Sequence, residues 1–207
     1  MKNKELERIS YALGLSMGNN FRSSGIKELD IKEFADGVAA VFAGSELKMS
    51  YDEAKEEIRK FFTALEEKQK EEANKVAEMN AAAGKAFLDE NAKREEIIVT
   101  NSGLQYEILK EGNGAQPTAA DSVTVHYTGK CLDGTVFDSS VERGTPATFG
   151  VTQVIAGWVE ALQLMKEGDK WRLYIPSDLA YGLNGAGGVI GPNATLIFDV
   201  ELIKVNN

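Results

Sequence analysis

The distribution of glycine and proline divides this chain of 207 residues into two parts with different folding behaviour. All four prolines and 14 of the 20 glycines follow residue 102, whereas the part before it is rich in Ala, Glu and Lys. Proline and glycine interrupt helices and form turns, so they limit where long helices can form. We therefore expect a helical first part and a second part of strands joined by turns.

Two helices are expected at the start of the first part. Apolar residues recur at helical spacing from Leu6 to Met17. Asp30, followed three residues later by Glu33, is the capping pattern that begins a second helix. Gly44 is the expected end of that helix, because glycine adopts the left-handed conformation at helix C-termini.

A third and much longer helix is predicted after the capping pattern of Ser50 and Glu53. No proline interrupts it before about residue 96. Residues 51–65 carry an apolar face, whereas 66–95 begin with a strongly polar run, so we expect 66–95 to form a largely solvated stalk. In the alternative, the stalk packs on the second part through four side chains, namely Val76, Met79, Ala83 and Phe87.

The expected domains are a helical dimerisation domain (1–65), a stalk (66–100) and a strand-rich domain (101–207). A helical unit of roughly 60 residues is marginally stable alone. Gly14 and Gly18 lie one turn apart and permit another backbone to approach closely. These two glycines fit homodimerisation and packing within one chain equally well.

The second part alternates between apolar and polar residues in the manner of strands. Strands are expected at 104–109, 123–128, 171–175 and 194–205, with one short helix between 153 and 164. An antiparallel sheet on one helix is an α+β domain of about 100 residues. The predicted fold class is therefore α+β, with an all-α domain at the N-terminus and the sheet domain at the C-terminus.

Charge and composition exclude several classes of function. The formal net charge of −9 disfavours nucleic-acid binding, and no apolar run is long enough to insert in a membrane. The chain has one cysteine, Cys131, so it can form no internal disulfide and no cysteine-rich metal site. It has one histidine, His126, so it can form no metal site with several histidines. Both residues are expected to be structural. No cofactor or metal is expected. Without an apolar leader the expected location is the cytoplasm, or the periplasm if a signal peptide has been removed.

The turns of the second part are unusually rich in aromatic and aliphatic residues. These include Tyr127, Phe137, Trp158, Tyr181, Val189 and Ile190. Such side chains indicate either a pocket for an apolar ligand or a cover for the sheet, and their chemistry alone does not distinguish the two.

Five stretches of the second part resemble the FKBP-type peptidyl-prolyl cis-trans isomerases, the family that binds tacrolimus and rapamycin. They are VHYTG (125–129), LDGTVFDSS (132–140), VIAGW (154–158), AYG (180–182) and ATLIFDVEL (194–202). The helical first part and the long helix resemble the Mip-like (macrophage infectivity potentiator) branch of dimeric bacterial isomerases. The resemblance thus implies a homodimer whose interface includes Leu13, Gly14, Met17 and Gly18.

The resemblance also implies a half-barrel sheet wrapped on one short helix, with a proline pocket between them. Trp158 would form the floor, Asp138 would be a buried polar group beside the bound amide, and Arg143 would be its ionic partner. Tyr181 and the backbone N–H of Ile155 would donate hydrogen bonds to the substrate. The implied catalytic residues are Asp138, Tyr181, Phe137 and Phe198. The implied substrate-binding residues are Tyr127, Arg143, Phe149, Val154, Ile155 and Trp158, with Val189 and Ile190 as further apolar candidates.

The implied function is isomerisation of X-Pro bonds in unfolded or partly folded polypeptides, with chaperone-like client binding by a V-shaped dimer. Tacrolimus and rapamycin are the implied inhibitors. The reaction breaks no covalent bond, which fits a chain without an obvious nucleophile or metal site. The alternative is a binding-only chaperone or adaptor with a non-catalytic pocket. Gly191-Pro192 stands where the family usually has Pro-Pro, so this loop is expected to be less rigid.

Overall fold

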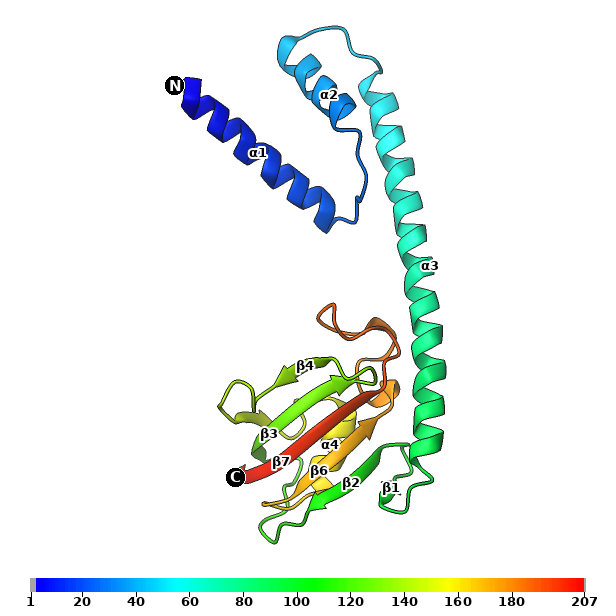
Figure 1. Ribbon diagram of the computed structural model, residues 1–207, viewed down its shortest axis with the longest axis vertical. Helices are drawn as coiled ribbons and strands as arrows, with labels where there is room; N and C mark the ends of the chain where they lie inside the picture. The colour runs from blue at the N-terminus through cyan, green and yellow to red at the C-terminus, as the bar shows by residue number, and fades with distance from the viewer. Residues whose placement is uncertain (1–2, 207) are drawn as a thin grey trace. The chain divides into compact units, whose positions relative to one another are not determined.

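The computed structural model describes residues 3–206 and consists of two compact units. The first unit extends to Glu71 and the second begins at Glu72, so the boundary lies within one helix. The first unit is helical and the second is built on an antiparallel sheet (Figure 1). The predicted α+β class is therefore confirmed. Within residues 3–206, no helix has the length and apolarity needed to cross a membrane.

Within residues 3–206 the first unit has three helices, and capping residues predict both ends of the second and the start of the third. The helices are α1 (Asn3–Ser23), α2 (Ile31–Ala43) and the first part of α3 (Tyr51–Asn91). The Asp30 carboxylate accepts hydrogen bonds from the backbone N–H groups of Lys32 and Glu33, both at 3.0 Å. Gly44 ends α2 with a φ of 61°, a left-handed conformation that glycine adopts without steric cost.

The first unit leaves its apolar side chains exposed. No described residue of α1 or α2 is buried, and the exposed fractions reach 72% for Tyr11 and 89% for Phe42. Gly14 and Gly18 have no atom of another segment within 4 Å of where a Cβ would stand. Within the described chain, the helices of this unit therefore lack the packing that would bury their apolar faces.

The last part of α3 belongs to the second unit and packs within it, so the expectation of a solvated stalk over 66–95 is wrong for this part. Its buried residues are Ala77, Gly84 and Asn91, spaced by seven. The Asn91 side chain donates to Gln105 Oε1 at 2.9 Å, and Gln105 Nε2 donates to the carbonyl of Leu88, also at 2.9 Å. The contacting face is made of small and polar residues, which the apolar pattern of the sequence does not reveal.

The alternative, in which the stalk packs on the second part, is correct for this last part of α3, but Met79 takes no part in the contact, and Val76 and Ala83 only border it. Met79 is 71% exposed, and Val76 and Ala83 are also exposed. Phe87 alone among the four predicted contacts is partly buried, with its ring centroid 5.8 Å from that of Tyr174. The observed contact stripe lies one residue further along the helix than predicted.

The second unit contains one seven-stranded sheet in the order β1-β2-β6-β7-β3-β4, with β5 also paired to β3 and every pairing antiparallel. The strands are β1 (Ile97–Val99), β2 (Gln105–Lys110), β3 (Ser122–Cys131), β4 (Val136–Ser139), β5 (Ala147–Gly150), β6 (Lys170–Ile175) and β7 (Leu196–Asn206). The four predicted strands are confirmed as β2, β3, β6 and β7. The short strands β1, β4 and β5 were not predicted, and β1 extends the sheet to before residue 101.

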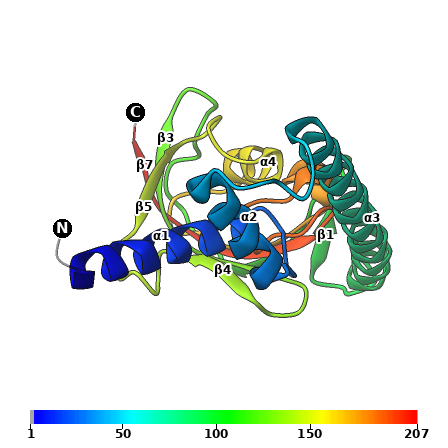
Figure 2. The same ribbon diagram turned by 90° about the horizontal axis from the view of Figure 1, so that it is seen from above.

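The sheet curves around α4 (Ala156–Leu164), as Figures 1 and 2 show. Alternate residues of β3 point to this helix, and Val123 and Val125 are fully buried there. On the opposite face charged residues pair across strands; Arg172, for example, donates to Asp199 at 2.5 Å. This alternation is the two-residue period of a strand with one covered face. It fixes which side chains of β3 and β7 reach the space beside α4.

Candidate active site

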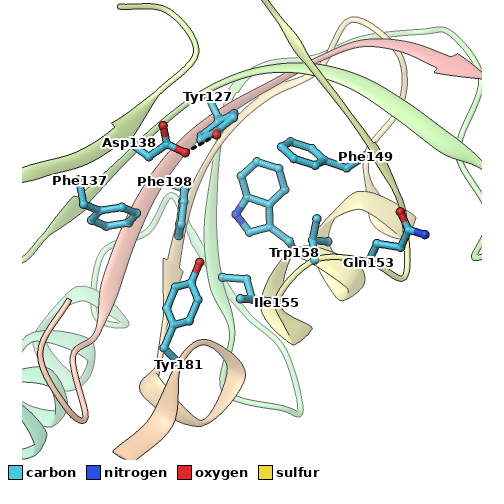
Figure 3. A pocket seen from close by; sticks show the side chains of 10 residues that line it. Tyr127, Phe137, Asp138, Phe149, Gln153, Ile155, Trp158, Tyr181 and Phe198 are labelled. Carbon is cyan, nitrogen blue, oxygen red and sulfur yellow. Dashed lines mark hydrogen bonds between the residues drawn. The ribbon is translucent and has the colours of Figure 1, made fainter. Parts of the chain in front are cut away.

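A cavity of about 440 Å³ opens in the second unit between the sheet and the start of α4 (Figure 3). Most of its lining is aromatic or aliphatic. The lining residues are Tyr127, Phe137, Asp138, Phe149, Gln153, Val154, Ile155, Trp158, Tyr181 and Phe198. Such a cavity suits an apolar ligand whose orientation is fixed by a few polar contacts.

Trp158 forms the floor of this cavity and is only 4% exposed. Its ring lies edge-to-face with those of Tyr127 and Phe198, each at a centroid distance of 5.3 Å. Trp158 lies in the first turn of α4, which is held close to the sheet because a Cβ on Gly157 would stand 2.6 Å from Ile175. Glycine at position 157 thus lets the floor lie directly against the strands.

The side walls depend on a second glycine, in β3. A Cβ on Gly129 would lie 2.6 Å from the rings of both Phe137 and Phe198. Without that Cβ, the two rings pack edge-to-face at 5.5 Å. Edge-to-face packing is a favoured arrangement of aromatic pairs, and here it closes one side of the cavity.

Asp138 carries the only carboxylate in the described lining of the cavity. The hydroxyl of Tyr127 donates to one carboxylate oxygen, and the Arg143 guanidinium donates to the other. Arg143 also donates to the Tyr127 hydroxyl at 3.1 Å, which closes a triangle of three side chains. Asp138 is thereby fixed in position at the cavity wall.

The triangle also sets the ionisation of its members. Burial raises the pKa of the Asp138 carboxyl, but the hydrogen bonds from Tyr127 and Arg143 and the charge of Arg143 outweigh burial and leave this pKa below its ordinary value. Burial, followed by the hydrogen bond to Asp138, raises the pKa of the Tyr127 hydroxyl. At neutral pH the pair therefore consists of a carboxylate and a protonated phenol.

Two hydrogen-bond donors at the cavity have no partner among residues 3–206. The Tyr181 hydroxyl points into the cavity in Figure 3. The backbone N–H of Ile155, the N-cap residue of α4, donates to no backbone carbonyl in the described chain. The first N–H groups of a helix lack intrahelical acceptors, so this amide is available to a ligand. Both donors belong to residues that line the cavity.

A third unpaired donor lies deeper in the cavity. The indole nitrogen of Trp158 is buried without a hydrogen-bond partner in the described residues. In Figure 3 this nitrogen lies on the side of the ring that faces Phe198. An N–H directed at an aromatic ring makes a weak hydrogen bond, which offsets part of the penalty of its burial.

Nine predicted residues line this cavity: Asp138, Tyr181, Phe137, Phe198, Tyr127, Phe149, Val154, Ile155 and Trp158. Arg143 lies behind the wall and contacts Asp138 and Tyr127 instead. The functional roles assigned to these residues remain predictions. Gln153 also lines the cavity and was not predicted, because an exposed glutamine before VIAGW carries no signal in the sequence.

The structure does not bring Val189 and Ile190 into the lining of this cavity, and their contact with substrate remains a prediction. Val189 is 52% exposed and borders a different cavity, whereas Ile190 is buried in the core. A backbone bridge joins Ala186 to Ile190 within this loop. Both residues are apolar, but only Ile190 is buried with the core.

The two singular residues lie outside the lining of the cavity. Nδ1 of His126 lies 3.0 Å from the hydroxyl of Ser140. Burial and the nearby Asp133 raise the pKa of the Cys131 thiol, so it is protonated at neutral pH and a weak nucleophile. Both observations agree with the expected structural roles.

Comparison with known proteins identifies the class that this fold and cavity define. The family described as FKBP-type peptidyl-prolyl cis-trans isomerase matches residues 113–203, and the domain amino terminal to FKBP-type peptidyl-prolyl isomerase matches residues 6–108. The chain belongs to the FKBP-type peptidyl-prolyl cis-trans isomerases, and its enzymatic activity is that of the family. Proteins of this family bind proline-containing substrates and macrolide inhibitors.

Within the family the chain is similar to Mip and FkpA proteins along nearly its whole length. The outer membrane protein MIP of Legionella longbeachae is 47% identical over 96% of this chain and 85% of its own length. The FKBP-type 22 kDa isomerase of Escherichia coli strain K12 is 43% identical over 95% and 93% of the two chains. The crystal structure of FkpA from Escherichia coli superposes with a TM-score of 0.75 at 34% identity, covering 100% of this chain and 98% of that one. The predicted Mip-like branch is thereby confirmed.

Proposed function

We propose that the chain accelerates X-Pro isomerisation in folding polypeptides by holding a twisted prolyl amide above Trp158, and that it binds these clients as a homodimer. The observation that carries the catalytic proposal is an aromatic cavity with two unpaired donors, the Tyr181 hydroxyl and the Ile155 N–H. No proton transfer or covalent step is required of any of these groups.

The barrier to the reaction is the loss of amide resonance, about 18–20 kcal/mol for a peptide bond. The planar amide has the larger dipole, so water stabilises it more than the twisted form. In the cavity, rings such as Trp158 and Phe198 replace that water and remove this preference. The twisted amide is thereby favoured relative to the planar one, which is the differential binding that lowers a barrier.

Through its charge, Asp138 acts on the same difference in energy between the planar and the twisted amide. Resonance places partial negative charge on the carbonyl oxygen, and twisting the amide withdraws part of it. A fixed carboxylate near that oxygen therefore disfavours the planar form more than the twisted form. Tyr127 and Arg143 keep Asp138 ionised and in place. The Tyr181 hydroxyl and the Ile155 N–H then fix the carbonyl groups that flank the rotating bond.

The experiment is a proline-peptide isomerase assay on the full chain and on the variant Tyr181→Phe. We expect kcat/KM to fall about tenfold, since a hydrogen bond made in the transition state is lost. Tyr106→Phe is the matched control, because Tyr106 stacks on Trp171 outside this cavity. Unchanged activity in Tyr181→Phe would remove the proposed role of this hydroxyl. Peptide binding without any turnover in the wild-type chain would favour the binding-only alternative.

The proposed homodimer is supported by the exposed apolar residues of α1. Leu13 is 61% exposed and Met17 42% exposed, and both share one side of the helix with Gly14 and Gly18. A second chain would bury these side chains and could approach closely at the glycines. The similarity to Mip and FkpA proteins over almost the full chain supports the same arrangement.

The dimer is tested by the molar mass of the variant Gly18→Leu in solution. We expect a monomer, because a leucine side chain at position 18 blocks close approach of the partner backbone. Ala12→Leu is the matched control, because position 12 lies on the opposite side of α1 and this variant should stay dimeric. A dimeric Gly18→Leu chain would show that this face is not the interface.

Client binding is tested with the same pair of variants. If the dimer binds unfolded chains, Gly18→Leu keeps its activity on short proline peptides but loses efficiency in the proline-limited refolding of a protein, whereas Ala12→Leu keeps both. Equal efficiency of the two variants on protein and peptide would refute the role of the dimer.

A further inference from the structure

The segment that carries Tyr181 has little regular structure of its own. Between Tyr181 and β7 it contains one short 3₁₀ helix, η2 (Gly182–Asn184), and one isolated backbone bridge. We call residues 182–195 the rim loop. Its five glycines are Gly182, Gly185, Gly187, Gly188 and Gly191. Because glycine loses the most conformational freedom on folding, such a loop needs support from elsewhere to hold a side chain in place.

That support comes from α3, which lies beside the rim loop in both views of the molecule (Figures 1 and 2). The side-chain amide of Asn80 donates to the carbonyl of Pro192 at 2.8 Å, and that of Asn193 donates to the carbonyl of Ala77 at 3.4 Å. All these residues belong to the second unit. Two hydrogen bonds thus join one turn of α3 to the same dipeptide of the loop.

The next contact leads from this dipeptide to the active site. The backbone N–H of Asn193 donates to the carbonyl of Gly182 at 2.8 Å, and Gly182 directly follows Tyr181. Asn193 has a φ of 54° and is the only non-glycine residue with positive φ in the described chain. Asparagine tolerates this conformation better than most residues. A continuous series of contacts therefore runs from α3 to Tyr181.

Two hydrogen bonds and a few close contacts, among them that of Gly84 with Thr195, hold the rim loop on α3. A cavity of about 380 Å³ lies between them and is bordered by Val76, Ala83, Cys131 and Val189. Gly191 is another place of close approach, because a Cβ there would lie 2.9 Å from Asn80 Nδ2. The polar contact of Asn80 thus lies at the border of a cavity and not within fully packed side chains.

We propose that Asn80 is a positioning residue for isomerisation, acting through Asn193 and Gly182 to hold Tyr181 at the cavity. The last part of α3 then belongs to the catalytic apparatus, in addition to connecting the two units. This proposal rests on the proposed contact of Tyr181 with the substrate.

The test is a double-mutant cycle in the full chain with Asn80→Ala, Tyr181→Phe and both together, assayed on a short proline peptide. Asn80→Ala should lower kcat/KM about fivefold in the wild-type chain, in line with the loss of one neutral hydrogen bond. In the Tyr181→Phe background the same change should have less than about a twofold effect, because coupled residues are non-additive. Asn74→Ala, an exposed asparagine on the same helix, is the control that should leave activity unchanged.

The outcomes separate this proposal from the assignment of Tyr181. An equal effect of Asn80→Ala in both backgrounds, or none in either, would overturn the positioning role. If instead Tyr181→Phe alone has no effect, the substrate contact fails first, and the proposal built on it falls as well. A second measurement follows the hydrogen exchange of the Asn193 amide. Faster exchange in Asn80→Ala but not in Asn74→Ala supports the proposed series of contacts, and unchanged exchange refutes it.

Discussion

Gly129 offers a direct test of how closely the cavity walls are set. In Gly129→Ala the added Cβ would lie 2.6 Å from the rings of Phe137 and Phe198, and those rings must retreat by about 0.8 Å to restore the 3.4 Å of ordinary contact. The backbone at position 129 does not have positive φ, so the conflict is purely steric. Overpacking of this kind destabilises a protein by about 1–3 kcal/mol. Because both rings line the cavity, their displacement should also reduce kcat/KM, by about tenfold.

The assay combines urea unfolding with the proline-peptide reaction. Gly37→Ala is the control, because it adds the same methyl group where no atom lies within 4 Å, and it should alter neither quantity adversely. The expected result is a lower unfolding midpoint and lower kcat/KM for Gly129→Ala alone. Wild-type stability and activity in Gly129→Ala would refute the inference that the two rings are held in tight contact.

Three further predictions concern charge and domain boundaries. Because the folded-state pKa of Asp138 lies below its ordinary value of 3.8, the contribution of its carboxylate is fully present above that value and is lost only as pH falls through the folded pKa. A protease-free assay should therefore give constant kcat/KM from about pH 8 to pH 5, and an acid limb beginning near pH 5 would contradict the assignment. Arg143→Met should move the acid limb of the pH profile of kcat/KM to higher pH. It should change stability little, since the ion pair with Asp138 is about half exposed. An unmoved acid limb would show that Arg143 does not lower the pKa of Asp138. A fragment of residues 72–207 should fold and isomerise peptides. A shorter fragment, 103–207, lacks β1 and α3 and should unfold at a lower temperature. Equal melting temperatures of the two fragments would contradict the stabilising role of β1 and α3.

The packing of α3 shows where sequence patterns fall short. Helix contacts are usually sought as stripes of large apolar residues. The stripe here is Ala77, Gly84 and Asn91, which are small or polar and bury little apolar area each. A Cβ on Gly84 would lie 2.3 Å from Thr195 Oγ1, so glycine is present because the rim loop comes close. The polar run before residue 76 correctly indicates an exposed segment, but nothing in the sequence shows where exposure ends.

The site was more predictable than the stalk. Nine lining residues followed from the resemblance of five stretches to the FKBP family, whose motifs record residues on strands, in α4 and in loops alike. Val189 and Ile190 lie outside those five stretches and do not line the cavity. Gln153 has an exposed side chain and reaches the cavity only because a tight turn follows β5, with the Gln153 N–H bonded to the carbonyl of Gly150 at 2.9 Å.

Three glycines of the second unit let side chains and backbone from distant parts of the sequence come close to one another. Gly157 lets α4 lie against Ile175, Gly129 lets two rings meet across β3, and Gly191 lets the rim loop reach Asn80. In each case the residue that occupies the space of the missing Cβ comes from another element. A motif records the glycine but not the neighbour that requires it, so the motif predicts the pocket while the support behind it becomes visible only in three dimensions. Substitutions at these glycines should therefore alter catalysis by displacing the neighbouring residues that an added Cβ would meet.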